Sequence, residues 1–218
     1  MRVTSDGPSP AAAARRAQIV SAAIDTIAEY GYMGSSFAKI AKTAGISSTR
    51  LISYHFDNKN DLMLAVIDHI IAAAEEYMNP RIMAESDYWA RISVYIRSNM
   101  EYLVEHTVQL RALLEINNNA QTPDGEPLLA MAYADPAVEV LEDVLRAGQA
   151  AGEFAEFDPH VMAVTMRAAI DTAGIRYAKG LEPDPAAYTN RLVELFGRSM
   201  LPHGDPRNGE SFNPEARQ

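Results

Sequence analysis

A short run of polar side chains between residues 48 and 54 has the chemistry needed to bind a nucleic acid. It contains hydroxyl groups at Ser48, Thr49 and Ser53, a guanidinium at Arg50 and a phenol at Tyr54. Such groups donate hydrogen bonds to phosphate oxygens and to the edges of bases. An arginine paired with a guanine contributes about 1–3 kcal/mol of base discrimination. If one element presents these side chains together, they indicate contact with double-stranded DNA.

The apolar residues around this run predict two short helices that would present it. The first helix has a stripe with i, i+3, i+4, i+7 spacing: Phe37, Ile40, Ala41 and Ala44. Ser35 or Ser36 can cap its start, and Gly45 can adopt the positive φ that ends it. The second helix has an inner face of Leu51, Ile52, His55 and Phe56. Two helices around a tight glycine turn are typical of a helix-turn-helix.

The distribution of charge favours DNA over a purely structural helix pair. Capped helix pairs also occur in proteins that never bind DNA, so the pattern alone leaves both interpretations open. The chain has 19 basic and 29 acidic side chains, a net charge of −10, which by itself disfavours a polyanionic partner. Residues 11–60 nevertheless carry a net charge of +3, and residues 61–218 carry −13. A basic head on an acidic body fits phosphate contact at one end only.

The remainder of the chain is predicted to be helical. We expect an all-α fold of about nine helices, because no segment has a convincing strand pattern. The predicted division is a helix-turn-helix domain over residues 11–58, a larger helical domain over 59–202 and a disordered tail over 203–218. There is no cysteine, no visible signal peptide in the polar first ten residues, and no apolar run near the roughly 20 residues that cross a bilayer. We therefore expect a cytoplasmic protein without membrane contact.

One predicted helix, near residues 159–179, is apolar on almost every side. A helix of this kind must be covered on both faces. It is either the central helix of a monomer core or, with the helix that follows, part of a symmetric four-helix interface between two copies. We favour the interface, because a palindromic DNA site requires a two-fold dimer. Its expected residues are Val161, Thr165, Ala168, Thr172, Leu192 and Phe196.

The N-terminal motifs resemble those of the tetracycline-repressor-like (TetR) transcriptional regulators. The resemblance depends on an N-terminal helix followed by F-A-K-I-A-K-T-A-G-I-S at residues 37–47, Y-H-F at 54–56 and D-N-K-N-D-L at 57–62. The close match covers about residues 15–67, and the remainder matches only in length and helix count. The resemblance implies a homodimer that binds a pseudo-palindromic operator. It also implies that residues 59–202 dimerise and bind a small effector that releases the DNA, and repression follows from family habit alone.

Residue by residue, the resemblance assigns two kinds of DNA contact. The implied phosphate contacts are Ser36, Lys39, Tyr54 and Lys59. The candidates for base contacts are Ser48, Thr49, Arg50 and Ser53. This chain departs from the commonest family pattern by one additional residue between Gly45 and Phe56. Because each residue turns a helix by about 100°, the choice between Thr49 and Arg50 as the base-reading residue stays open.

The acidic part of the chain offers apolar and aromatic side chains for an effector pocket. The candidates are Trp89, Tyr95, Met100, His106, Met131, Tyr133, Met162 and Met166. Ordinary core packing is the alternative for each, since methionine and aromatic stripes at helical spacing commonly fill space. The net charge of −13 favours a neutral or cationic ligand over an anionic one.

Other classes of function find little support in the sequence. The five histidines form no i, i+4 pair, and neither a glycine-rich phosphate loop nor a G-x-S-x-G elbow occurs. We therefore expect no enzyme, no cofactor and no metal. A helical scaffold that binds only proteins is the remaining alternative, and it would be indifferent to duplex DNA at any salt concentration.

Overall fold

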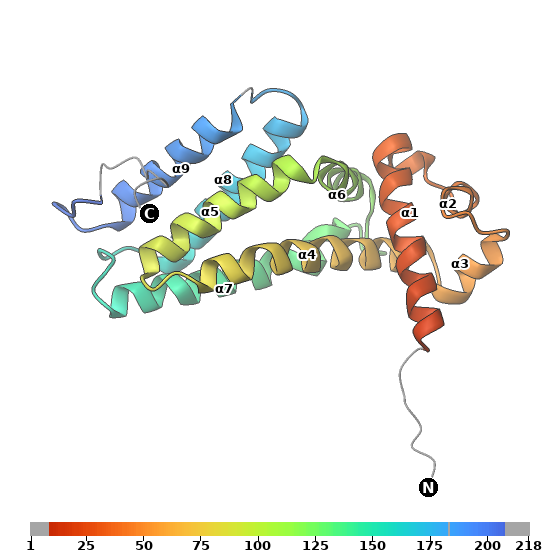
Figure 1. The fold of residues 1–218 in the computed structure, drawn as a ribbon, viewed down its shortest axis with the longest axis horizontal. Helices are drawn as coiled ribbons and strands as arrows, with labels where there is room; N and C mark the ends of the chain where they lie inside the picture. The colour runs from red at the N-terminus through yellow and green to blue at the C-terminus, as the bar shows by residue number, and fades with distance from the viewer. Residues whose placement is uncertain (1–8, 183, 208–218) are drawn as a thin grey trace, which may run out of the picture. The chain divides into compact units, whose positions relative to one another are not determined.

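A computed structural model describes residues 9–182 and 184–207, apart from the side chains of residues 129–136. Within these residues the chain forms nine helices and no β-strand beyond one isolated bridge between Gln121 and Pro127. This confirms the predicted all-α class (Figure 1). Helices α1 to α4 span Pro10–Gly34, Phe37–Thr43, Thr49–His55 and Lys59–Met83. Helices α5 to α9 span Tyr88–Glu105, Thr107–Asn119, Leu128–Ala150, Pro159–Ala178 and Pro185–Met200.

One compact unit contains the chain up to Ile71 together with Arg111–Ala132. Helices α1, α2 and α3 and the first half of α4 surround a core to which the second half of α6 also contributes. Its fully buried members include Ile19, Ile27, Ile40, Ile52, Phe56, Leu62, Ile67 and Ile116. As a packing unit it therefore extends beyond the predicted range 11–58. The reason is that α4 and α6 cover apolar faces that the first three helices leave open. The functional division at residue 58 stays a prediction.

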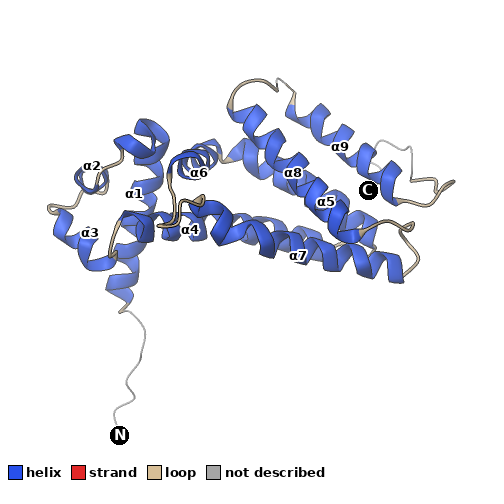
Figure 2. Cartoon of the chain, turned by 180° about the vertical axis from the view of Figure 1, so that it is seen from behind, coloured by secondary structure: helices blue, strands red, loops and turns tan. Residues whose placement is uncertain are grey.

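The second unit contains Ala72–Leu110 and the described residues from Tyr133 to Arg207. Within it, α5 packs against α8 and α9, and Figure 2 shows these three helices side by side. The core is built mainly from α5, α7, α8 and α9 and includes Ile92, Ile96, Leu145, Met166, Ile170, Ala173 and Met200. This unit contains both the predicted effector residues with described side chains and the predicted dimer residues.

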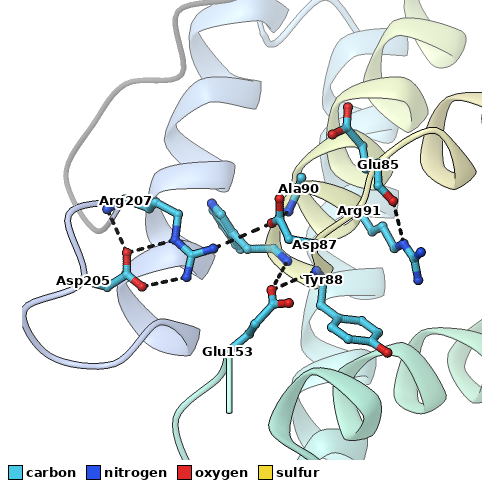
Figure 3. A network of polar contacts seen from close by, with 9 residues as sticks. Glu85, Asp87, Tyr88, Ala90, Arg91, Glu153, Asp205 and Arg207 are labelled. Carbon is cyan, nitrogen blue, oxygen red and sulfur yellow. Dashed lines mark hydrogen bonds and ion pairs between the residues drawn. The ribbon is translucent and has the colours of Figure 1, made fainter. Parts of the chain in front are cut away.

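A polar network holds the C-terminal described residues against the start of α5 (Figure 3). Asp87 caps α5 by accepting a hydrogen bond from the Ala90 amide at 2.8 Å, and Glu153 accepts one from the Tyr88 amide at 2.9 Å. Arg207 lies 3.7 Å from the Asp87 carboxylate and 2.7 Å from that of Asp205. Residues 205–207 of the predicted tail are thus held in place, and 208–218 lie outside the described residues.

Candidate nucleic-acid interface

The first helix of the predicted pair begins and ends at polar and glycine positions. Ser36 caps α2, its Oγ accepting a hydrogen bond from the Lys39 amide at 3.3 Å. Gly45 has a φ of 65°, a left-handed conformation that glycine adopts without steric cost. The chain then turns so that the Ile46 amide donates to the Ala41 carbonyl at 3.0 Å. These local bonds end α2 and direct the chain into the next helix.

The second helix presents the polar run to solvent. Ser48 caps α3, because its Oγ accepts a hydrogen bond from the Arg50 amide at 3.1 Å. Ile52 is completely buried, and Tyr54 is 80% exposed. The other outward residues are Thr49, Arg50 and Ser53, all exposed. The outward face thus agrees with the predicted pattern, whereas contact with bases stays a prediction.

The segment with the additional residue between Gly45 and Phe56 consists of a short connection followed by α3. Since Ser48 is the cap, α3 begins at Thr49, and residues 45–48 form the connection. Thr49 and Arg50 both stand in the first turn of α3, the end of a recognition helix that reaches base edges. The structure places both side chains in solvent, so the choice between them remains open.

Helix α1 supports this pair through a side chain that sequence reasoning missed. The Gln18 amide nitrogen donates to the Ala44 carbonyl at 2.7 Å, directly after α2. Gln18 Oε1 in turn accepts a hydrogen bond from Arg15 at 2.6 Å. The two partners of Gln18, Ala44 and Arg15, are 26 and 3 residues away, so only the second could be expected from helical spacing.

The two lysines implied as phosphate contacts both lie over tyrosine rings. Lys39 Nζ is 3.5 Å from the centroid of the Tyr30 ring. Lys59 Nζ is 3.7 Å from the centroid of the Tyr32 ring and donates a hydrogen bond to the Tyr32 carbonyl at 2.6 Å. Lys59 is half-buried, and this burial lowers the pKa of its ammonium. Ser36, the third implied phosphate contact, is exposed at the start of α2.

The end of α1 is shaped by a glycine and by a carboxylate from α6. Gly31 interrupts the helical conformation with a φ of 73° and a ψ of 166°. The following amide, that of Tyr32, donates to the Glu115 carboxylate at 2.9 Å. The Tyr32 carbonyl also accepts a hydrogen bond from Ser35 Oγ at 2.7 Å. The helical conformation is therefore interrupted at Gly31, and a short further stretch of helix ends at Gly34.

The predicted effector residues divide into buried, half-buried and undescribed positions. Met100 and Met166 are fully buried in the core of the second unit, and Trp89, Tyr95 and Met162 pack against that core. The His106 ring stacks on that of Tyr102, with centroids 3.9 Å apart. Met131 and Tyr133 fall among the side chains outside the description. An open cleft of about 980 Å³ lies elsewhere, in the first unit between the start of α4 and residues 122–128, and no effector candidate with a described side chain lines it.

The predicted dimer residues also divide into two groups. Four residues of α8 are exposed in the single chain: Val161, Thr165, Ala168 and Thr172. On α9, by contrast, Leu192 is 7% and Phe196 4% exposed, and both pack in the core of their own unit. Helix α9 packs against α5 and α8 within the single chain, and the inclusion of these two residues in an intersubunit surface stays a prediction.

Neither a cluster of potential metal ligands nor a membrane-crossing helix is seen among the described residues. Among them, no cluster of three or more histidine, cysteine, aspartate or glutamate side chains has a geometry that could hold a metal ion. No helix in the described part of the chain combines the length and apolar character that a membrane crossing requires.

A capped helix pair around a glycine turn, with an exposed polar second helix, defines this chain as a helix-turn-helix protein. Residues 19–66 match the family model described as bacterial regulatory proteins, tetR family. The N-terminal part of the chain therefore contains the domain that this tetR family model describes, which confirms the resemblance inferred from the motifs.

Individual relatives agree with this assignment over different lengths. The HTH-type transcriptional regulator RutR of Escherichia coli K12 is 35% identical over 95 residues, 43% of each chain, so the match spans less than half of that relative. The transcriptional regulator FadR of Bacillus subtilis, solved with stearoyl-CoA, has a TM-score of 0.71 at 23% identity, over 82% of this chain and 96% of FadR. A putative transcriptional regulator of Saccharomonospora viridis, solved with choline, has a TM-score of 0.72 at 22% identity, over 87% and 99%. At these identities the two structures show a shared fold.

Proposed function

We propose that this protein is a DNA-binding transcriptional regulator that acts in the cytoplasm and lies on the nucleoid when bound. The observation that carries the proposal is the exposed face of α3, where Thr49, Arg50, Ser53 and Tyr54 stand together within residues 11–60, which carry a net charge of +3. Side chains of these types bind phosphates and base edges. The tetR family match over residues 19–66 covers this same helix pair and supports the same role.

The regulator acts, in this proposal, as a homodimer on a pseudo-palindromic operator, and it represses. The exposed apolar stripe of α8 supports a two-fold contact between chains, since Val161 is 59% and Val164 43% exposed in the single chain. A dimer would place two copies of α3 one helical turn of DNA apart. Repression is proposed because it is the usual activity of the regulators that the N-terminal motifs resemble.

A small effector that releases the DNA completes the proposal. We favour a neutral or cationic effector because residues 61–218 carry a net charge of −13. The fold itself does not select the charge, since one structure of this fold was solved with stearoyl-CoA and another with choline. The effector residues Trp89, Tyr95, Met100, His106, Met162 and Met166 remain candidates in the second unit.

The deciding experiment is a footprint of the full chain on the DNA that adjoins its own gene, followed by titration of the protected duplex at several salt concentrations. We expect a protected pseudo-palindrome and an affinity that falls steeply between about 50 and 200 mM salt. Choline and stearoyl-CoA can then be added as cationic and anionic probes. Only choline is expected to release the protein from the duplex. Indifference to duplex DNA at low salt would overturn the proposal and favour the protein scaffold.

A further inference from the structure

The segment Tyr30–Tyr32 lies beneath both lysines that are implied as phosphate contacts. Lys39 Nζ of α2 lies 3.5 Å from the centroid of the Tyr30 ring. Lys59 Nζ of α4 lies 3.7 Å from the centroid of the Tyr32 ring. The two lysines are 20 residues apart in the sequence and belong to different helices. One short segment at the end of α1 thus supports cations from two elements.

These lysines are poorly placed for the stability of their own helices. Lys39 is the third residue of α2, and Lys59 is the first residue of α4. A cation in the first turn opposes the helix dipole, which favours negative charge at that end. The position therefore needs another explanation, and an anion outside the chain, such as a DNA phosphate, supplies one.

An aromatic ring is a suitable support for a cation that must still attract a phosphate. The face of the ring attracts the ammonium through its quadrupole but carries no net charge. A carboxylate partner would cancel the charge, whereas a ring leaves it available. Holding a lysine in place before binding also reduces the rotamer entropy that complex formation would otherwise cost.

Contacts other than those with the two lysines also fix the segment Tyr30–Tyr32. The backbone conformation of Gly31 lets the chain turn between the two tyrosines. The Glu115 carboxylate accepts the Tyr32 amide at 2.9 Å, and Ser35 Oγ donates to the Tyr32 carbonyl at 2.7 Å. The backbone that positions the two tyrosine rings is therefore itself held in place.

We propose that Tyr30 and Tyr32 are positioning residues for DNA binding, which hold the side chains of Lys39 and Lys59 in place for contact with the phosphates. This inference rests on the proposed function. It assigns to the two rings a role that acts only through the lysines above them. A purely structural role for the same tyrosines would act on folding and would not depend on the lysines.

A double-mutant cycle separates these two roles. Tyr30 is 46% exposed, so Tyr30→Leu is compatible with folding. We expect Tyr30→Leu to weaken binding of the full chain to a fluorescein-labelled mixed-sequence duplex by about two- to fivefold, the effect of one exposed cation–π contact. The slope of log affinity against log salt is expected to fall by at most about 0.9. In a Lys39→Ala background, Tyr30→Leu is expected to have no further effect.

Matched variants control the cycle. Tyr30→Phe keeps the ring and is expected to bind like the wild type. Lys42→Ala, another lysine of α2, is expected to give a loss that simply adds to that of Tyr30→Leu. Urea unfolding of every variant reports whether the fold is retained. The corresponding cycle of Tyr32→Leu with Lys59→Ala tests the second pair, with Tyr32→Phe as its control.

The outcomes distinguish this inference from the function on which it rests. A wild-type chain without affinity for duplex DNA overturns both. Wild-type binding, together with an equal loss from Tyr30→Leu whether or not Lys39 is present, overturns the positioning role alone.

Discussion

Arg50 and the two tyrosine-supported lysines differ in how each side chain is held, and this difference predicts different roles. Arg50 is exposed in the first turn of α3, where its guanidinium is open to a base edge. Lys39 and Lys59 are partly covered and lie against rings. Lys59 also donates to the backbone of α1, so its removal affects folding as well as DNA contact. Lys39 is therefore the cleaner probe of phosphate contact.

Replacing Arg50 tests base readout. Arg50→Ala is expected to lower the discrimination between the footprinted operator and a mixed-sequence duplex by about 1–3 kcal/mol. Lys39→Ala is expected to weaken both duplexes alike and to reduce the salt slope by about 0.9. Competition titrations with the two duplexes measure both quantities. A uniform loss of affinity in Arg50→Ala, with discrimination retained, would contradict its assignment to a base.

At the scale of elements, the end of α1 is held by its own backbone conformation and by contacts with two other helices. Gly31 occupies a backbone region that is essentially restricted to glycine, with a φ of 73° and a ψ of 166°. A Cβ added there would lie 3.1 Å from the Glu115 carboxylate of α6. The same α1 segment thus joins α6 through Glu115 and α4 through Lys59. Its backbone couples three elements of the unit.

This constraint makes Gly31 sensitive to substitution. Gly31→Ala is expected to reduce the free energy of unfolding by about 1–3 kcal/mol through backbone strain, with an additional loss from crowding against Glu115. Gly45→Ala is the control, because Gly45 also has a positive φ of 65° but has no atom within 4 Å of the added Cβ. Urea unfolding compares the two. If Gly45→Ala were the more costly substitution, the role given to the α1–α6 contact would be wrong.

For the whole molecule, the proposed homodimer raises the question of which surface would join two chains. The stripe of α8 with Val161, Thr165, Ala168 and Thr172 is exposed, whereas Leu192 and Phe196 already pack within the chain. A dimer contact through α8 would therefore bury new apolar surface without removing anything from the core. Truncation of Phe196 would instead create a cavity in the single chain and would not report on assembly.

A charge placed in the α8 stripe tests this surface. Ala168→Arg is expected to give a folded monomer that no longer binds the pseudo-palindrome as a pair, because an unpaired cation in an interface is costly. Val140→Arg, at a 68% exposed position of α7, is the matched control and is expected to leave the dimer intact. Sedimentation gives the molar mass of each variant. A dimeric Ala168→Arg chain would exclude this stripe as the interface.

The parts of the molecule that the sequence predicted are those set by neighbours within a turn or two of helix. Ser36, Gly45 and Ser48 act on amides two or three residues away or on their own φ, so type and spacing indicate the helix pair directly. The apolar stripe likewise predicted Ile52 and Phe56 as buried and Thr49 and Tyr54 as outward, and the structure agrees.

Tertiary structure alone determined which distant side chains meet. Glu115 and Tyr32 are 83 residues apart, and no local pattern relates a carboxylate in α6 to an amide at the end of α1. The placement of Lys39 and Lys59 over two nearby rings depends in the same way on how three helices cross. An apolar stripe records that a surface must be covered but not what covers it. For this reason the sequence predicted Leu192 and Phe196 as residues of an interface with a second chain, whereas the folded chain buries both side chains in its own core.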